Sequence, residues 1–127
     1  MILLDSSVLI ELFRSKDKEK TLFYKLLETE NDFGISIITH CELGIGSNEK
    51  QTAFWNEFLT SVTIFKFDTN CSIVAIDIYK QLKANSKLID LADILIASTS
   101  VANQIPLATL NLKHFERIKG LEIVPNP

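Results

Sequence analysis

Short apolar runs alternate with helix-length segments along this chain, and the alternation constrains its fold more than any other feature. Strand-length apolar runs stand at residues 2–4, 33–38, 62–67, 105–109 and 121–124. The segments between them repeat their apolar residues at the spacing of a helix, most clearly over 71–85 and 91–103. This order is typical of βαβ units, whose strands pair in parallel. It predicts an α/β fold built on a parallel sheet.

Length and composition indicate one domain. A chain of 127 residues can bury a core without disulfides or a structural metal, and its 46% hydrophobic and 23% charged residues are ordinary for a globular protein. No apolar stretch approaches the roughly 20 residues of a membrane span, so we expect a cytoplasmic protein. In that compartment Cys41 and Cys71 would be packed, reduced thiols, and their spacing does not suit a metal site.

The charge of the chain argues against a protein that coats nucleic acid with a large basic face, because the net charge is −3. It does not exclude a nuclease, which can hold a phosphodiester through a bound metal and a few local cations. Three groups of such cations stand out: Arg14, Lys16, Lys18 and Lys20; Lys80, Lys83 and Lys87; Lys113, His114, Arg117 and Lys119. The ordinary interpretation of these groups is solvated helix faces.

Acidic residues stand where a parallel sheet would present them at one edge. Asp5 directly follows the apolar run 2–4, Glu42 follows the second run, and Asp93 stands at the start of an apolar helix. Ligands of open α/β sheets bind just outside the carboxyl ends of the strands. Because right-handed crossovers bring strand ends and helix starts together, we expect Asp5, Glu42 and the turn at 109–111 to share that edge.

Each acid also has a purely structural interpretation. Asp5 or Ser6 could cap the next helix, since both residue types are favoured N-caps. Thr39-x-x-Glu42 has the form of a capping box, in which the glutamate reaches back to the threonine amide. Asp90 is well placed as an N-cap, with Asp93 at the third helical position, where the helix dipole favours negative charge. The case for a site therefore depends on the acids lying together.

Carboxylates gathered at one edge repel one another and call for a cation. Oxygen ligands without His or Cys partners suit Mg²⁺ or Mn²⁺ rather than zinc. One or two such ions lower the pKa of bound water and direct it at phosphorus, so the pattern favours phosphodiester hydrolysis. The sequence holds no P-loop, GxGxxG, HExxH or GxSxG motif that would indicate another chemistry.

Four short motifs, in order and at suitable spacing, resemble the PIN domain. They are Asp5-Ser6-Ser7, Thr39-x-x-Glu42-Leu43-x-x-Gly46, Asp93-x-x-Ile96-Ala97 and Thr109-x-Asn111-x-x-x-Phe115. Each is weak alone, but together with the chain length they are similar to the VapC-type toxins of bacterial toxin–antitoxin pairs over essentially the whole sequence.

The resemblance implies a single PIN-like domain over residues 1–127, with a three-layer α/β/α arrangement and a parallel sheet of about five strands. It implies an endoribonuclease toxin that uses Mg²⁺ or Mn²⁺ to cut a defined cellular RNA. It also implies two protein partners: a cognate VapB-like antitoxin that covers the acidic site, and a second copy of the chain in a homodimer.

Position by position, the resemblance assigns roles to five residues. Asp5 and Asp93 are expected to contact metal directly, and Glu42 to contact it or to hold a metal-bound water. Ser6 and Asn111 are expected to orient water or phosphate. Asn111 stands where the family has Asn or a fourth acid, which leaves a second metal less well supported and makes a one-metal mechanism more plausible.

Two other functions remain open at the level of sequence. A PIN-like domain that is catalytically silent could serve only to bind a partner protein. A Mg²⁺-binding phospho-acceptor signalling domain would need an early acid pair, an Asp after the third strand and a later Lys. Ser6 follows Asp5 here, and no Lys is well placed after Thr109, so the signalling alternative fits less well.

Overall fold

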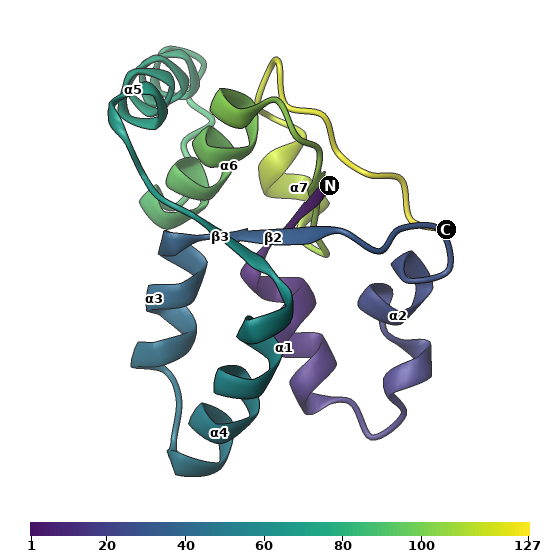
Figure 1. Ribbon diagram of the computed structural model, residues 1–127. Helices are drawn as coiled ribbons and strands as arrows, with labels where there is room; N and C mark the ends of the chain where they lie inside the picture. Colours follow the sequence, from purple (N-terminus) through teal and green to yellow (C-terminus); the bar gives the residue numbers. More distant parts are fainter.

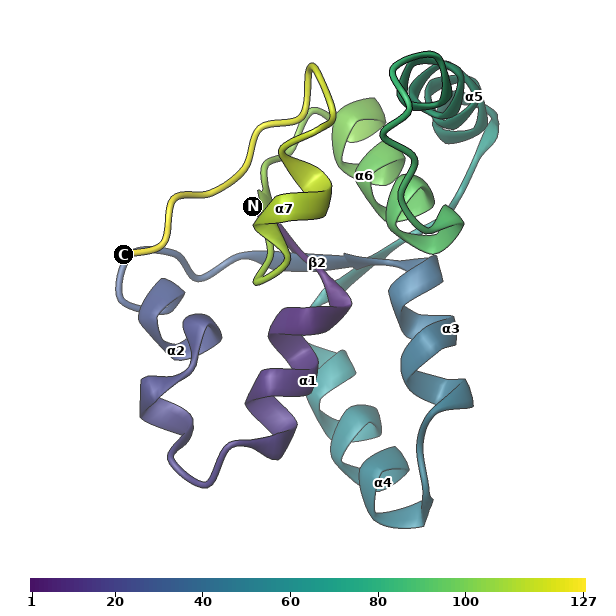
Figure 2. The ribbon, with the colours of Figure 1, turned by 180° about the vertical axis from the view of Figure 1, so that it is seen from behind.

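A parallel sheet separates two layers of helices in the computed structural model, which describes residues 1–127 (Figures 1 and 2). The strands are β1 (Ile2–Leu4), β2 (Phe33–Ser36), β3 (Thr63–Phe65) and β4 (Leu107–Ala108). They are ordered β3-β2-β1-β4, and every pair is parallel. The α/β prediction is confirmed.

Helices cover both faces of the sheet. One layer, below the sheet in Figure 1, contains α1 (Ser6–Arg14), α2 (Leu22–Leu26), α3 (Ile37–Ile45) and α4 (Glu49–Phe58). The other contains α5 (Thr69–Ala84), α6 (Leu91–Asn103) and α7 (Leu112–Phe115). Short 3-10 turns lie at Lys18–Lys20 and Leu59–Ser61. No helix combines the length and apolar character needed to cross a bilayer.

The last predicted strand is present as a single parallel bridge between Leu107 and Ile123. The Leu107 amide donates to the Glu122 carbonyl (2.9 Å), and the Val124 amide donates to the Leu107 carbonyl (2.8 Å). The C-terminal segment thus extends the sheet beyond β4, and the expectation of about five strands is close to the observed four strands plus this bridge.

β1 is buried on both faces, which explains its continuous apolar run. Ile2 and Leu4 join the core on the side of α1 to α4, together with Trp55. Leu3 points to the opposite core, where it packs with residues of α5 and α6 such as Ile78. The central strand therefore links two hydrophobic cores, and its burial fixes the position of the next residue in the chain.

The second strand is shorter than predicted. It ends at Ser36, and Ile37 and Ile38 belong to the first turn of α3 rather than to the strand. The cause is local: the Ser36 hydroxyl accepts a hydrogen bond from the Ile38 amide (3.1 Å) and so caps the helix. Glu42 therefore lies in the second turn of α3 rather than in its first.

Gly34 marks a close approach between β2 and β3. A Cβ atom placed on Gly34 would lie 2.5 Å from Cε2 of Phe65 and 3.2 Å from the Thr63 carbonyl oxygen. A Cβ atom placed on Gly44, in α3, would have no other atom within 4 Å. The two glycines therefore allow a controlled test of the close approach at Gly34.

We predict that Gly34→Ala lowers the free energy of unfolding by about 1–3 kcal/mol, because the Phe65 ring must leave its packed position. Gly44→Ala should raise stability by up to about 1 kcal/mol, since alanine favours a helix. Urea unfolding of both variants measures the difference. Equal stabilities for the two variants would contradict the close approach.

Candidate active site

Asp5 lies one residue beyond β1 and is only 3% exposed. It stands at the N-cap position of α1, but its side chain makes no capping hydrogen bond. Instead its Oδ2 accepts from Ser7 Oγ (2.7 Å) and from Thr109 Oγ1 (2.9 Å). The capping interpretation of the Asp5 carboxylate is therefore wrong.

The second oxygen of Asp5 is free. Oδ1 takes part in no hydrogen bond within the chain, and no buried side-chain oxygen or nitrogen lacks a partner. Oδ1 must therefore reach solvent. The carboxylate is held rigidly through one oxygen and offers the other to a ligand.

Ser6 joins α1 to Glu42 of α3. Ser6 Oγ donates to Glu42 Oε1 (2.7 Å) and also lies 3.1 Å from Thr39 Oγ1. The capping-box interpretation of Thr39 and Glu42 is wrong, because α3 begins earlier, after Ser36, and Thr39 is inside the helix. The Glu42 side chain is consequently released from any capping role and points to the sheet edge.

Asp93 and Asn111 meet through a histidine. His114 Nδ1 lies 3.1 Å from Asp93 Oδ2 and 2.8 Å from Asn111 Nδ2. This contact connects α6 to α7. Asp90 takes the N-cap position of α6 as expected, but its exposed side chain makes no capping hydrogen bond.

The acids of this edge influence each other electrically. Burial raises the pKa of Asp93 above its ordinary value of 3.8, the hydrogen bond from His114 opposes the rise, and the negative charge of Asp5 adds to it. Contacts also link the two acids: Thr109 Oγ1, which binds Asp5, accepts from the Asn111 amide (2.9 Å), and Asn111 contacts the histidine that holds Asp93. Asp5 and Asp93 therefore belong to one site. The sequence prediction that these acids gather at the strand ends agrees with this geometry.

Lysine and arginine do not neutralise the site. The ion pairs of the structure are Met1–Glu30, Lys20–Asp17 and His114–Asp93. Asp5 and Glu42 thus have hydroxyl partners but no cationic partner. A buried carboxylate without a cation is costly, so the site suits an external positive ion.

The donor set fits a hard divalent cation. No group of three His, Cys, Asp or Glu side chains is arranged as a ready-made cage. Mg²⁺, however, keeps several waters and is commonly bound through only one or two carboxylates. Asp5, with a free oxygen, and half-buried Asp93 meet that requirement, and Glu42 is the third acid within the same edge.

The sequence predicts neither Ser7 nor His114 in its role, and it leaves Thr109 open between a strand residue and a hydroxyl that faces the site. Ser7 and Thr109 orient Asp5, and His114 orients Asp93. The sequence held partial signals, because Ser7 belongs to the Asp5-Ser6-Ser7 motif and His114 stands three residues after Asn111, on the same helical face. The contacts of Thr109 with Asp5 and of His114 with Asp93 span more than 20 positions, and no local pattern reveals such a contact.

Comparison with known proteins agrees with this architecture. The PIN-domain family profile matches residues 2–121. Ribonuclease VapC1 of Methanocaldococcus jannaschii is 41% identical over 125 residues, covering 96% of this chain and 85% of the relative. VapC ribonuclease Y4jK of Sinorhizobium fredii is 31% identical over 138 residues, covering 100% and 97%.

Solved structures show the same fold. The crystal structure of VapBC2 from Rickettsia felis, bound to a DNA fragment from their promoter, matches with a TM-score of 0.86 and 26% identity over 98% of both chains. DNA-bound VapBC from Salmonella typhimurium also gives a TM-score of 0.86, at 24% identity over 97% and 96%. This chain belongs to the PIN-domain family and groups with its VapC members.

Removal of the Asp93 charge should stabilise the fold at neutral pH. The raised pKa means that the folded state binds the Asp93 proton more tightly than the unfolded state does. Protonated Asp93 therefore stabilises the fold at low pH, and this stabilisation is lost as the pH rises through the raised pKa. We predict that Asp93→Asn raises the free energy of unfolding by about 0.5 kcal/mol at pH 7. The value is small because solvent screens a half-buried carboxyl. The gain should vanish near pH 3.

Urea unfolding at both pH values measures this effect. Asp77→Asn, on the exposed face of α5, is the matched control and should show no such pH-dependent gain. A loss of stability for Asp93→Asn at pH 7 would contradict the raised pKa of Asp93.

Proposed function

We propose that this chain is a Mg²⁺- or Mn²⁺-dependent endoribonuclease toxin of the cytoplasm, which hydrolyses phosphodiester bonds in a specific cellular RNA. One observation carries the proposal: a chain of side-chain contacts joins Asp5 to Asp93 at one sheet edge, where no Lys or Arg neutralises either acid. The relatives named as ribonucleases support the same activity.

Asp5 and Asp93 would hold the ion, with Glu42 as a further ligand or as the holder of a metal-bound water. The bound ion would supply a water of lowered pKa and positive charge at the phosphate. Ser7 and Thr109 keep the Asp5 carboxylate in one orientation. This preorganisation avoids a reorganisation cost when charge develops in the reaction.

Glu42 and Ser6 would act on the attacking water. Glu42 is exposed to solvent, and Ser6 holds one of its oxygens at 2.7 Å. The other oxygen is available to accept a proton. On the opposite side of the site, Asn111 and His114 orient Asp93 and present an amide group to the substrate phosphate.

Cleavage of total cellular RNA tests the activity. With Mg²⁺ or Mn²⁺ the protein should release discrete fragments, and a chelator should abolish them. Asp5→Asn and Asp93→Asn should each lower the cleavage rate by about 100-fold or more, because each removes a charged ligand. Asp77→Asn should cleave like the wild type.

Equal cleavage by the two site variants and the wild type would contradict the proposed site. Folded protein, free of antitoxin, that cleaves nothing with either metal would support the catalytically silent partner-binding domain instead.

Ser6 and Glu42 should behave as one unit. We predict that Ser6→Ala reduces cleavage about tenfold, because it removes the hydrogen bond that orients Glu42. Glu42→Gln should reduce cleavage about 100-fold, because the amide can neither take up a proton nor supply a negative charge. The double variant should lose about as much as Glu42→Gln alone, since Ser6 acts through Glu42 and coupled residues are not additive. Single-turnover rates of the four proteins measure the coupling, and a multiplicative loss would refute it.

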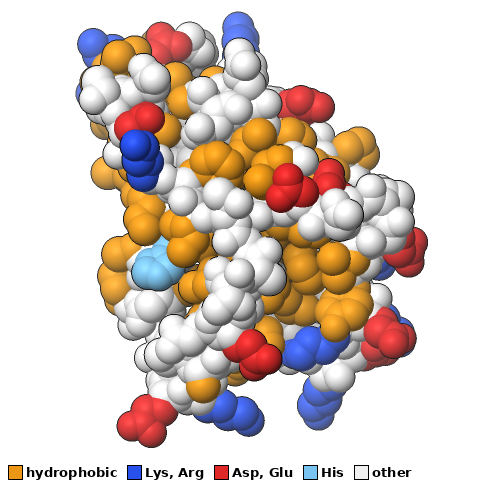
Figure 3. Space-filling model, viewed as in Figure 1, with side chains coloured by type: hydrophobic (Ala, Val, Ile, Leu, Met, Phe, Trp, Pro, Cys, Tyr) orange, Lys and Arg blue, Asp and Glu red, His pale blue; other side chains and the backbone are white.

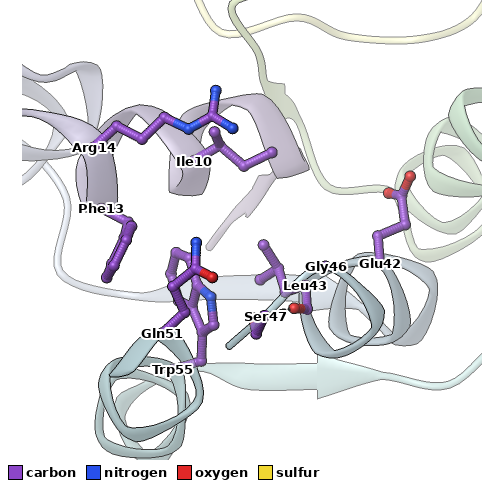
Figure 4. Close-up of a pocket in the computed structure, with 9 residues that line it drawn as sticks. All are labelled: Ile10, Phe13, Arg14, Glu42, Leu43, Gly46, Ser47, Gln51 and Trp55. Atoms are coloured by element: carbon purple, nitrogen blue, oxygen red, sulfur yellow. Dashed lines mark hydrogen bonds between the residues drawn. The ribbon is translucent and has the colours of Figure 1, made fainter. Parts of the chain in front are cut away.

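An antitoxin is the proposed regulator. The neighbouring structures of VapBC complexes support such a partner. A cavity of about 150 Å³ lies between α1, α3 and α4, with Trp55 in its lining and Glu42 at one end (Figure 4). We propose that an apolar side chain of the antitoxin enters this cavity and thereby covers Glu42. The adjacent Ile45, 82% exposed, would extend the contact.

A homodimer is also proposed. On the view of Figure 3, hydrophobic side chains reach the surface in patches, while charged ones lie mostly around the periphery. On α5 and α6, Ile76 and Leu91 are 53% and 61% exposed and line an apolar groove. A second copy of the chain would bury these side chains.

We predict that Ile76→Glu converts the dimer to a monomer, because a charge in an apolar interface must be desolvated. Sedimentation velocity at micromolar protein measures the change. Ile45→Glu, on the opposite helical layer, is the control and should leave the dimer intact. A wild type that sediments as a monomer would contradict the proposal.

A further inference from the structure

A basic cleft lies between α7 and the connection from α5 to α6. Its lining consists of Ser86, Lys87, Lys113, Glu116 and Arg117, around a volume of about 630 Å³. Three cations thus face one acid, in a protein whose net charge is −3. The cleft has no hydrophobic lining residue, so it does not suit an apolar ligand.

The fold assembles this cleft from two cation groups that are far apart in the sequence. Lys87 lies just beyond the end of α5, whereas Lys113 and Arg117 belong to α7 and the turn after it. Arg117 Nη1 donates to the carbonyl oxygens of Lys87 and Leu88, both at 3.4 Å. These bonds hold the two walls of the cleft together.

The cations of the cleft form no ion pairs within the protein. Lys87, Lys113 and Arg117 take part in none of the ion pairs of the structure, and all three are exposed. Their charges are therefore available to an anionic ligand.

The cleft flanks the acidic site. Lys113 directly precedes His114, whose ring contacts Asp93. A single turn of α7 therefore contributes one residue to the basic cleft and one to the acidic site. Figure 2 shows the connection that carries Lys87 passing from α5 to the start of α6, and the Arg117 hydrogen bonds join this connection to the turn after α7. The cleft and the acidic site therefore share α7 as a common wall.

We propose that this cleft binds the phosphate backbone of the RNA beside the scissile bond. The inference rests on the proposed nuclease function. An acidic edge repels a phosphodiester, and a nearby cationic cleft offsets that repulsion and raises the local concentration of the strand. Because no aromatic residue lines the cleft, it grips the backbone and fixes register without reading bases.

The test measures RNA binding without cleavage. Fluorescence anisotropy with a labelled single-stranded RNA of about 20 nucleotides is followed over a KCl series in EDTA. The double variant Lys87→Gln/Lys113→Gln leaves Arg117 and its carbonyl contacts in place. We expect about tenfold weaker binding at low salt, and a log–log salt slope reduced by about 1.4, since each phosphate contact to a single strand contributes about 0.7.

Two further variants control for charge and shape. Lys25→Gln/Lys50→Gln changes the net charge equally, on exposed positions of α2 and α4 across the sheet. It should keep its affinity within about twofold of the wild type. Lys87→Arg/Lys113→Arg should retain both affinity and salt slope, because the charges persist.

An unchanged affinity of Lys87→Gln/Lys113→Gln, or an equal loss in Lys25→Gln/Lys50→Gln, would overturn the proposal. Loss of binding to a poly-glutamate peptide, with RNA binding intact, would assign the cleft to an acidic protein segment and also overturn it. If the wild type binds RNA through the cleft but cleaves no RNA with either metal, the nuclease function is contradicted. The assignment of the cleft as an RNA-binding site is then retained.

Discussion

The parallel pairing of β1 with neighbours on both sides is the constraint on which the site depends. The amide of Asp5 donates to the carbonyl of Ala108 (2.9 Å), and the amide of Leu3 donates to that of Pro106 (2.9 Å). These bonds bring the end of the first strand against a segment about 100 positions later. Asp5 and Thr109 meet only because this pairing exists, and the contacts of α6 and α7 with the same core then bring Asp93 to the edge.

The site combines firm positioning with unfavourable charge. Hydrogen bonds from hydroxyls to a carboxylate contribute about 1.5–3 kcal/mol each, and Asp5 accepts two of them. Burial raises the pKa of Asp93, and the repulsion from Asp5 adds to the rise. A protein selected for stability alone would place a lysine or an apolar residue there. The retained repulsion is the expected cost of a site prepared for a cation.

Much of the fold and the outline of the site could be predicted from the sequence, because they depend on local patterns. The run of Ile2 to Leu4 is buried on both faces, and Asp5 follows it at the sheet edge. The start of α3 could not be predicted, since Ser36 and Thr39 are both favoured caps and the end of β2 decides between them. The contact of His114 with Asp93 and the meeting of Lys87 with Lys113 depend on tertiary packing, which no local spacing encodes.

Binding of Mn²⁺ to the purified protein tests the central claim most directly. Isothermal titration calorimetry would compare the wild type with Asp5→Asn and with Asp77→Asn as control. The account predicts a site in the wild type and in the control, and an affinity at least about tenfold lower in Asp5→Asn, since a charged ligand is lost. Equal binding by all three proteins would contradict the assignment of the acidic edge as a cation site.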